Sequence, residues 1–314
     1  MDKSIFQTLL AMIDDLIPEQ KEEIKKAIDE IDSFKKVVSI IDSRILSDLK
    51  CKHCKSLKVK KWGMQSGLQR FMCMDCNRTF NSLTGTSLAH LRKKEQWLNM
   101  AIALKESISI KNTAERCTVA ISTAFRWRHR FLAPIQQDSA NKLEGIAEAD
   151  ETYFLESFKG QRNITRPSRK RGGKAKSSGL SREQVPVLIA RDRAGGIIDA
   201  VLTDQTTSSI MRVLFGKVGS ENILCIDGGN ALWGFVNSQK IQYRIIAPSK
   251  HVHEQDPVFH IQNVNAYHSR LKEWIKRFHG VATKYLPNYL GWRRMFEKPD
   301  TVLSSTAWVQ AAAG

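Results

Sequence analysis

The segment 262–272, QNVNAYHSRLK, places three polar side chains on one side of a predicted helix. Asn265, His268 and Lys272 are separated by three and four residues, so they share one helical face. The apolar residues follow a second stripe with helical spacing, which predicts the side that packs into the core: Val264, Tyr267, Leu271, Trp274 and Phe278. The polar face is either a solvated surface or part of a site, and acidic residues elsewhere bear on that choice.

Two aspartates stand at strand-like runs upstream of this helix. Asp150 lies in EADETYF, and Asp227 ends the apolar run NILCID before Gly228 and Gly229. Desolvating a carboxylate without a partner is costly, so an acid at the end of a buried strand points to a ligand. Two such acids on neighbouring strands can hold a divalent metal ion. The glycines leave room for a phosphodiester backbone to approach.

Four of the six cysteines form two C-x-x-C pairs, Cys51 with Cys54 and Cys73 with Cys76, with 18 residues between the inner cysteines. This spacing predicts two knuckles that place four thiolates around a structural zinc ion, without an open position for water. A redox or accidental pairing is the alternative. The remaining two cysteines are isolated in apolar surroundings, so we expect a reduced, intracellular compartment.

Residues 105–131 have the pattern of a helix-turn-helix, for which an ordinary helical pair is the alternative. Thr113, Ala114 and Cys117 suit the first helix, and residues 118–120 suit the turn. In the second helix we expect five buried residues, Ile121, Ala124, Phe125, Trp127 and Phe131. The same helix would direct Ser122, Thr123 and Arg126 toward a DNA major groove and bring Arg128 and Arg130 near phosphates.

The remaining pattern predicts a helical start and a mixed sheet. Residues 1–46 read as helix with a break at Pro18, and this segment either pairs with another copy or packs on the body. From about residue 145, three strand-like runs are followed by a helix at 206–218, a strand, a helix at 230–239 and a further strand. This order indicates a mixed α/β layer.

The chain carries a formal net charge of +17, which favours binding to a negatively charged partner. Residues 1–50 contain 8 basic and 11 acidic residues, residues 51–150 contain 17 and 8, and residues 151–314 contain 24 and 13. The excess of basic residues therefore extends over both 51–150 and 151–314. Residues 159–176 contain eight Lys or Arg and no acid. We interpret this loop, with Arg169, Lys170 and Arg171, as a DNA contact rather than a solvated insertion. No apolar run approaches the roughly 18 residues of a membrane span, so no membrane partner is expected.

Together these motifs resemble the insertion-sequence transposases of the ISXO-like group over about residues 47–296. Beyond the cysteines, the resemblance rests on LTGTSL, DETYF, IDGG and the block beginning NVNAYHSRLK. It implies a multidomain α+β chain with an N-terminal helical segment (1–46), a zinc ribbon (47–86), a helix-turn-helix (87–140), a ribonuclease-H-like catalytic domain (141–297) and a C-terminal tail (298–314).

The resemblance also implies the site chemistry. Members of the group use two Asp and a third ligand, Glu or Asn, with Lys seven positions later, as for Asn265 and Lys272. Asp150 and Asp227 would bind two Mg²⁺ ions, for which Mn²⁺ can substitute, and the Asn265 oxygen would be the third ligand. Lys272 would hold a phosphate and His268 would help to position DNA. Glu254 and Glu273 are the rival third ligands.

The function that follows is a DNA transposase acting in the nucleoid. It would bind the terminal repeats of its element, cleave double-stranded DNA at the ends and join them to target DNA, as a homodimer or larger assembly. A non-catalytic, domesticated DNA-binding regulator is the alternative, and a nuclease that only hydrolyses is a third possibility. The neutral Asn265 removes one negative charge from the site relative to the Glu version.

Overall fold

The computed structural model describes residues 2–164, 166, 167, 169, 172, 173, 175, 181, 183–246, 257–298 and 304–314. It divides into two compact units. One comprises Met1–Phe131 with Ser304–Gly314, and the other comprises Leu132–Leu303. Each unit is described by itself. In the described part of the chain, no helix combines the length and the apolar character that crossing a membrane requires.

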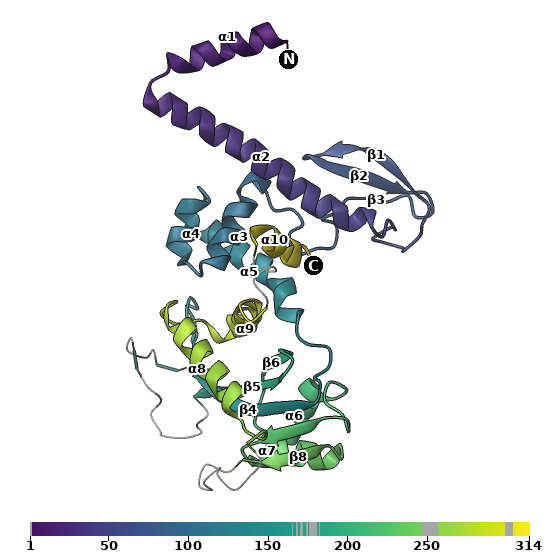
Figure 1. Cartoon of the computed structure of the whole chain (residues 1–314), viewed down its shortest axis with the longest axis vertical. Helices are drawn as coiled ribbons and strands as arrows, with labels where there is room; N and C mark the ends of the chain where they lie inside the picture. The colour runs from purple at the N-terminus through teal and green to yellow at the C-terminus, as the bar shows by residue number, and fades with distance from the viewer. Residues whose placement is uncertain are drawn as a thin grey trace. The chain divides into compact units, whose positions relative to one another are not determined.

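Two helices open the first unit, as the sequence predicts (Figure 1). Helix α1 (Lys3–Asp14) ends before Pro18, the first residue of α2 (Pro18–Leu46), where proline loses no helical hydrogen bond. The last part of α2 buries Val37, Ile41 and Ile45. Its first part leaves isoleucines exposed, and α1 buries no residue, so both helices keep an uncovered apolar face.

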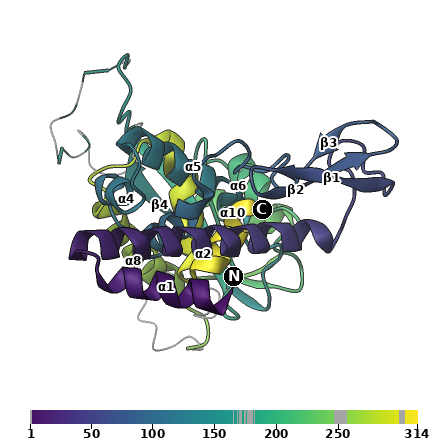
Figure 2. The same cartoon turned by 90° about the horizontal axis from the view of Figure 1, so that it is seen from above.

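A three-stranded antiparallel sheet lies beside the C-terminal part of α2 (Figure 2). It consists of β1 (Val59–Gln65), β2 (Leu68–Cys73) and β3 (Thr79–Phe80). The rings of Phe71 and Phe80 stack 5.7 Å apart and pack with Ile45 and the first cysteines of both pairs. This small core joins the cysteine-bearing segment to the long helix.

The rest of the first unit is helical: η1 (Lys94–Gln96), α3 (Trp97–Lys105), α4 (Ile110–Arg116), the start of α5 (Ile121–Gln137) and α10 (Ser305–Ala313). Ser109 caps α4 by accepting the Asn112 N–H at 3.2 Å. The buried rings of Trp97 and Phe131 meet edge to face, 5.8 Å apart. Helix α10 packs on α2 and α3, so the end of the chain completes this unit.

The second unit is built on a five-stranded sheet of order β6-β5-β4-β7-β8. The strands are β4 (Ile146–Leu155), β5 (Gln184–Asp192), β6 (Ile197–Val201), β7 (Ile223–Ile226) and β8 (Gln242–Ile245). Strand β5 is antiparallel to both neighbours, while β4, β7 and β8 run parallel. A meander of three strands followed by two parallel strands is the ribonuclease-H-like arrangement, and it confirms the predicted fold class.

Helices cover both faces of this sheet. Helices α6 (Thr207–Leu214) and α7 (Asn230–Ser238) pack on one face and form an apolar core with it. Helix α8 (Gln262–Lys276) packs on β4 and β5, and α9 (Leu286–Met295), which follows η3 (Thr283–Tyr285), packs on β6. The strand-to-helix alternation along the chain therefore places the predicted site residues on β4, directly after β7 and on α8.

Candidate active site and nucleic-acid interface

The sheet register places the two aspartates side by side. Parallel strands β4 and β7 pair Ala149 with Ile226, so Asp150 and Asp227 are the next residues on adjacent strands. The Asp150 side chain is 18% exposed, and Asp227 is exposed just beyond β7. Burial and then the neighbouring Asp227 carboxylate raise the pKa of Asp150 to about 6, against the opposing effect of Lys272.

A tight turn fixes Asp227 after its strand. Gly228 has a φ of +91°, a conformation that glycine adopts at little cost. The Gly229 N–H donates to Oδ1 of Asp227 at 2.8 Å. Helix α7 then begins at Asn230, so the carboxylate is held between the end of a strand and the start of a helix.

The polar face of α8 meets the aspartates. The His268 ring is buried, with Nδ1 3.7 Å from Oδ2 of Asp150. Burial and the Lys272 charge lower the pKa of His268 to about 4. Asn265 and Lys272 are exposed on the same face, on either side of the histidine. The structure thus brings Asp150, Asp227, His268 and Lys272 together and leaves Asn265 exposed on the same face of α8. The buried ring of His268 has little surface for DNA, contrary to the role expected from the sequence.

The rival third ligands are not equivalent to Asn265. Glu273 is exposed and pairs with Lys276 at 2.6 Å. Glu254 lies outside the described residues. A further acid that the sequence reading missed is Glu151, whose pKa is raised to about 7 by burial and by the charges of Asp150 and Asp227. The only sequence signal for it is its place beside Asp150.

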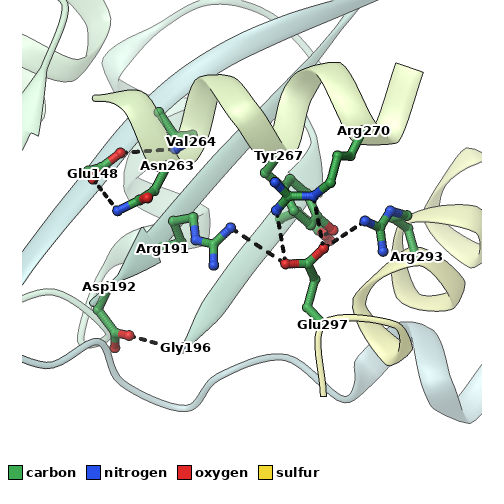
Figure 3. A network of polar contacts seen from close by, with 11 residues as sticks. Glu148, Arg191, Asp192, Gly196, Asn263, Val264, Tyr267, Arg270, Arg293 and Glu297 are labelled. Carbon is green, nitrogen blue, oxygen red and sulfur yellow. Dashed lines mark hydrogen bonds and ion pairs between the residues drawn. The ribbon is translucent and has the colours of Figure 1, made fainter. Parts of the chain in front are cut away.

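Helix α8 is held at its start by Glu148, another residue that the sequence reading missed. Its carboxylate accepts the Val264 N–H and the Asn263 side-chain amide, each at 2.9 Å (Figure 3). Alternation along EADETYF puts Glu148 and Asp150 on the same face of β4, which was the available signal.

In the first unit, two helices joined by a short turn form where the sequence predicts them, with Cys117 as the C-cap of α4 and α5 starting at Ile121. Thr113, Ala114, Cys117, Ala124, Trp127 and Phe131 are buried as expected. Ile121 and Phe125 are instead 58% and 39% exposed. They share the outer face of α5 with exposed Ser122 and Arg126, and Thr123 is partly buried.

Two arginines of α5 donate hydrogen bonds within the first unit. Arg128 is 1% exposed and donates to the Ile108 carbonyl at 2.7 Å and to Oγ1 of Thr113 at 2.9 Å. Arg130 donates to the carbonyls of Ser87 and Ala89. The guanidinium of Arg128 is buried inside the unit, so its expected phosphate contact is wrong. Arg130 is partly exposed, and its phosphate contact stays a prediction.

The basic loop is described only in part. Arg169 forms an ion pair with Glu183 at 3.1 Å and donates to the Glu156 carbonyl at 2.6 Å. Its side chain is 18% exposed, so it fastens the loop to the end of β4 instead of presenting a free charge to DNA. Lys170 and Arg171 lie outside the described residues.

The four predicted zinc ligands cluster, with all sulfur atoms within 4.8 Å of one another. Both pairs form the same turn. The Cys51 N–H donates to the Ser56 carbonyl at 2.8 Å, and the Cys73 N–H donates to the Arg78 carbonyl at 3.0 Å. Two matching turns with converging thiols form a cluster that can hold a metal ion.

Comparison with known proteins gives the class and then the family. The strand order and the paired carboxylates define a ribonuclease-H-like unit with an acidic site. The model of the ISXO2-like transposase domain matches residues 142–293. The unit Leu132–Leu303 therefore belongs to the ISXO2-like transposases, and the resemblance seen in the sequence is confirmed for this part of the chain.

One curated relative is the uncharacterized protein in transposable element ISH50 of Halobacterium salinarum, 26% identical over 259 residues, which cover 79% of this chain and 86% of the relative. One similar solved structure is a simian T-cell lymphotropic virus intasome, with 10% sequence identity and a TM-score of 0.30; the match covers 63% of this chain and 68% of that chain. Another is the Mos1 strand transfer complex, with 13% sequence identity and a TM-score of 0.22; the match covers 63% of this chain and 73% of that chain. TM-scores this low carry no weight, and the fold assignment rests on the sheet topology.

Proposed function

We propose that the protein is the transposase of an insertion sequence, which binds the terminal repeats of the element, cleaves DNA at its ends and joins them to target DNA. The observation that carries this proposal is the position of Asp150 on β4 beside Asp227, the first residue after the neighbouring strand β7, with His268 of α8 against Asp150. The matching family model supports the class of reaction.

The residues at this site fit hard divalent cations. Burial and the Asp227 carboxylate raise the pKa of Asp150, so a bound cation would favour its ionised form, and Mg²⁺ or Mn²⁺ takes such oxygen ligands. Asp150 and Asp227 would hold the ions, and Asn265 would add a neutral oxygen. A pair of bound ions would activate the attacking water or 3′-hydroxyl and stabilise the leaving oxygen.

The protein's own side chains have separate tasks in this proposal. Lys272 is an exposed cation on the face that meets Asp150, where it would bind a DNA phosphate. His268 stays neutral at physiological pH and packs against Asp150, so it limits how far that carboxylate can move. Glu151, with a pKa raised to about 7, would be only partly ionised beside the pair at neutral pH.

Recognition of the ends is assigned to the start of α5. Ser122, Thr123 and Arg126 lie at the N-terminal end of the second helix of a helix-turn-helix, the part that contacts base edges in this motif. The four cysteines would hold a structural zinc ion, because their thiols converge without another ligand. Replacing Cys73 with Ser should release zinc and unfold residues 47–86, measured by metal analysis and circular dichroism.

A second copy of the chain is part of the proposal, because two ends must be joined. The uncovered isoleucines of α2, Ile24, Ile28 and Ile31, repeat at helical spacing among charges of both signs, which suits contact between like helices. Light scattering of the protein alone and on element ends measures the assembly.

The decisive experiment mixes purified protein with Mg²⁺ and a labelled element end and scores nicked and joined products. Asp150→Asn and Asp227→Asn should each lower cleavage by about 10²–10³-fold or more while end binding persists, because the carboxylates serve the metal ions. Asn265→Ala should also remove cleavage, whereas Glu273→Gln should not. Cleavage without joining would identify a hydrolytic nuclease, and binding without cleavage would identify a regulator.

A matched pair of arginines tests the DNA interface. Arg126→Ala should weaken binding to the specific end by about 1–3 kcal/mol and leave thermal stability unchanged, because its side chain is exposed. Arg128→Ala should lower stability by about 2 kcal/mol, because it leaves two buried oxygens without a donor. Equal losses on specific and random DNA for Arg126→Ala would contradict the recognition assignment.

A further inference from the structure

The Glu148 carboxylate is fully buried, two residues before Asp150 on the same face of β4. Burying a charged carboxylate is costly unless several donors surround it. Glu148 is not one of the proposed metal ligands, and its burial therefore calls for a different role. Its partners identify that role.

Two of its donors form the first turn of α8. Val264 donates its N–H to Oε2 and Asn263 donates its side-chain amide to Oε1. The N-cap residue Ile261 has no side-chain acceptor, and the first N–H groups of a helix have no partner within it. Glu148 supplies that acceptor from the sheet, and its negative charge lies at the helix end that favours it.

Two further groups close the cluster. Arg193 places Nη2 3.1 Å from Oε1 of Glu148 and donates to the Val258 carbonyl at 3.0 Å. Its Nη1 lies 2.7 Å from Nε2 of His260. The other ring nitrogen, Nδ1, lies 3.3 Å from Oε1 of Glu148 and 3.2 Å from the backbone nitrogen of Gln262. The segment entering α8 is thus held to the same carboxylate.

We propose that Glu148 is the positioning residue of the active site: it sets the start and the rotation of α8 over β4, so that Asn265 faces the aspartates. This inference rests on the proposed function. Asn265 directly follows Val264, and a helix turns about 100° per residue, so fraying of the first turn would displace Asn265 first. Lys272 lies two turns further along and would be displaced less.

The test compares two isosteric changes of buried carboxylates on neighbouring strands. Asp192 is 3% exposed and accepts the N–H groups of Gly196 at 2.7 Å and Glu144 at 2.9 Å, both outside α8. Glu148→Gln and Asp192→Asn should both lower stability. Only Glu148→Gln should weaken binding of Mn²⁺ alone, by about tenfold as measured by calorimetry on zinc-loaded protein, because it loosens a ligand-bearing turn.

Amide exchange gives a readout that needs neither metal nor DNA. Glu148→Gln should speed exchange at Val264 and Asn265, and Asp192→Asn should not. Asn263→Ala removes one donor and leaves Glu148 in place, so it should give a smaller Mn²⁺ effect of about threefold if Glu148→Gln proves too unstable.

Unchanged Mn²⁺ affinity in Glu148→Gln, or an equal loss in Asp192→Asn, would overturn the positioning role. A wild-type protein that binds no Mn²⁺ would contradict the proposed function itself and with it the role of Glu148 in that function. The exchange rates at Val264 would then show separately whether Glu148 holds the start of α8.

Discussion

The two faces of the sheet in the unit Leu132–Leu303 are packed by opposite chemistry. The face under α6 and α7 is apolar, with Leu224, Ile226 and Phe235 fully buried. The face under α8 and α9 buries charged groups, among them the carboxylates of Glu148, Asp199 and Glu297. Glu297 forms ion pairs with three arginines, Arg191, Arg270 and Arg293 (Figure 3). Asp199 forms an ion pair with Arg294 and accepts a hydrogen bond from the Tyr267 hydroxyl.

The two faces contribute differently to the stability of the unit and to the orientation of the helix that carries site residues. Apolar packing is favourable for many relative positions of two surfaces, because burial of apolar area has no direction. Hydrogen bonds and ion pairs require particular distances and angles, so they select one placement. The helix that carries Asn265 and Lys272 lies on the charged face, where Glu148 and Glu297 hold it. We infer that the apolar face stabilises the unit and the charged face aligns the site.

The largest expected effect lies on the apolar face. Phe235→Ala should lower the free energy of unfolding by about 3–5 kcal/mol, because it leaves a cavity among fully buried side chains. Urea unfolding measures it. The Mn²⁺ affinity of the folded variant should differ from that of the original protein by no more than about twofold. Changes beside metal ligands typically lower metal affinity by about tenfold or more. A tenfold loss of affinity would break the separation of roles.

A smaller effect is expected on the charged face. Glu297→Gln should cost about 2 kcal/mol, because it leaves three guanidinium groups around a neutral amide. The loss should shrink in high salt, since Arg270 is 45% exposed in that cluster. Urea unfolding at two ionic strengths checks this, and a salt-independent loss would indicate packing instead of charge.

An effect of the opposite sign is expected at the acidic site. In protein without added Mg²⁺, Asp150→Asn should raise stability at pH 7.5 by about 3 kcal/mol, because the folded state must ionise a carboxyl whose pKa is about 6 instead of 3.8. A raised pKa means that the folded state binds the proton more tightly. The original protein therefore loses stability as pH rises from 3.8 to about 6.

The gain from Asp150→Asn should accordingly shrink as pH falls through about 6 and vanish below 3.8. Thermal unfolding of both proteins across this range provides the measurement. If the stability gain of Asp150→Asn does not change with pH, folding does not raise the free energy of ionising Asp150. The repulsion between Asp150 and Asp227 would then be too weak to support a metal site.

Local patterns allowed much of the architecture to be predicted. The strand-like runs of the sequence became the five strands of 4 to 10 residues, and apolar spacing of three and four became the helices, because each depends on neighbours along the chain. The cysteine spacing predicted the thiol cluster in the same way. The burial of Arg128 could not be predicted, because its acceptors at Ile108 and Thr113 belong to other parts of the fold.

By itself, the sequence determined the elements, the cysteine cluster and the residue types of the site, since these follow from composition and short-range spacing. Only the tertiary structure decided that Asp150 meets Asp227, that His268 turns inward against Asp150, and that Glu148 holds the start of α8. These contacts join residues 77 to 118 positions apart in the chain, as the numbering of Asp150, Asp227 and His268 gives. Such pairings depend on strand register and on the burial of charge, which no local pattern specifies.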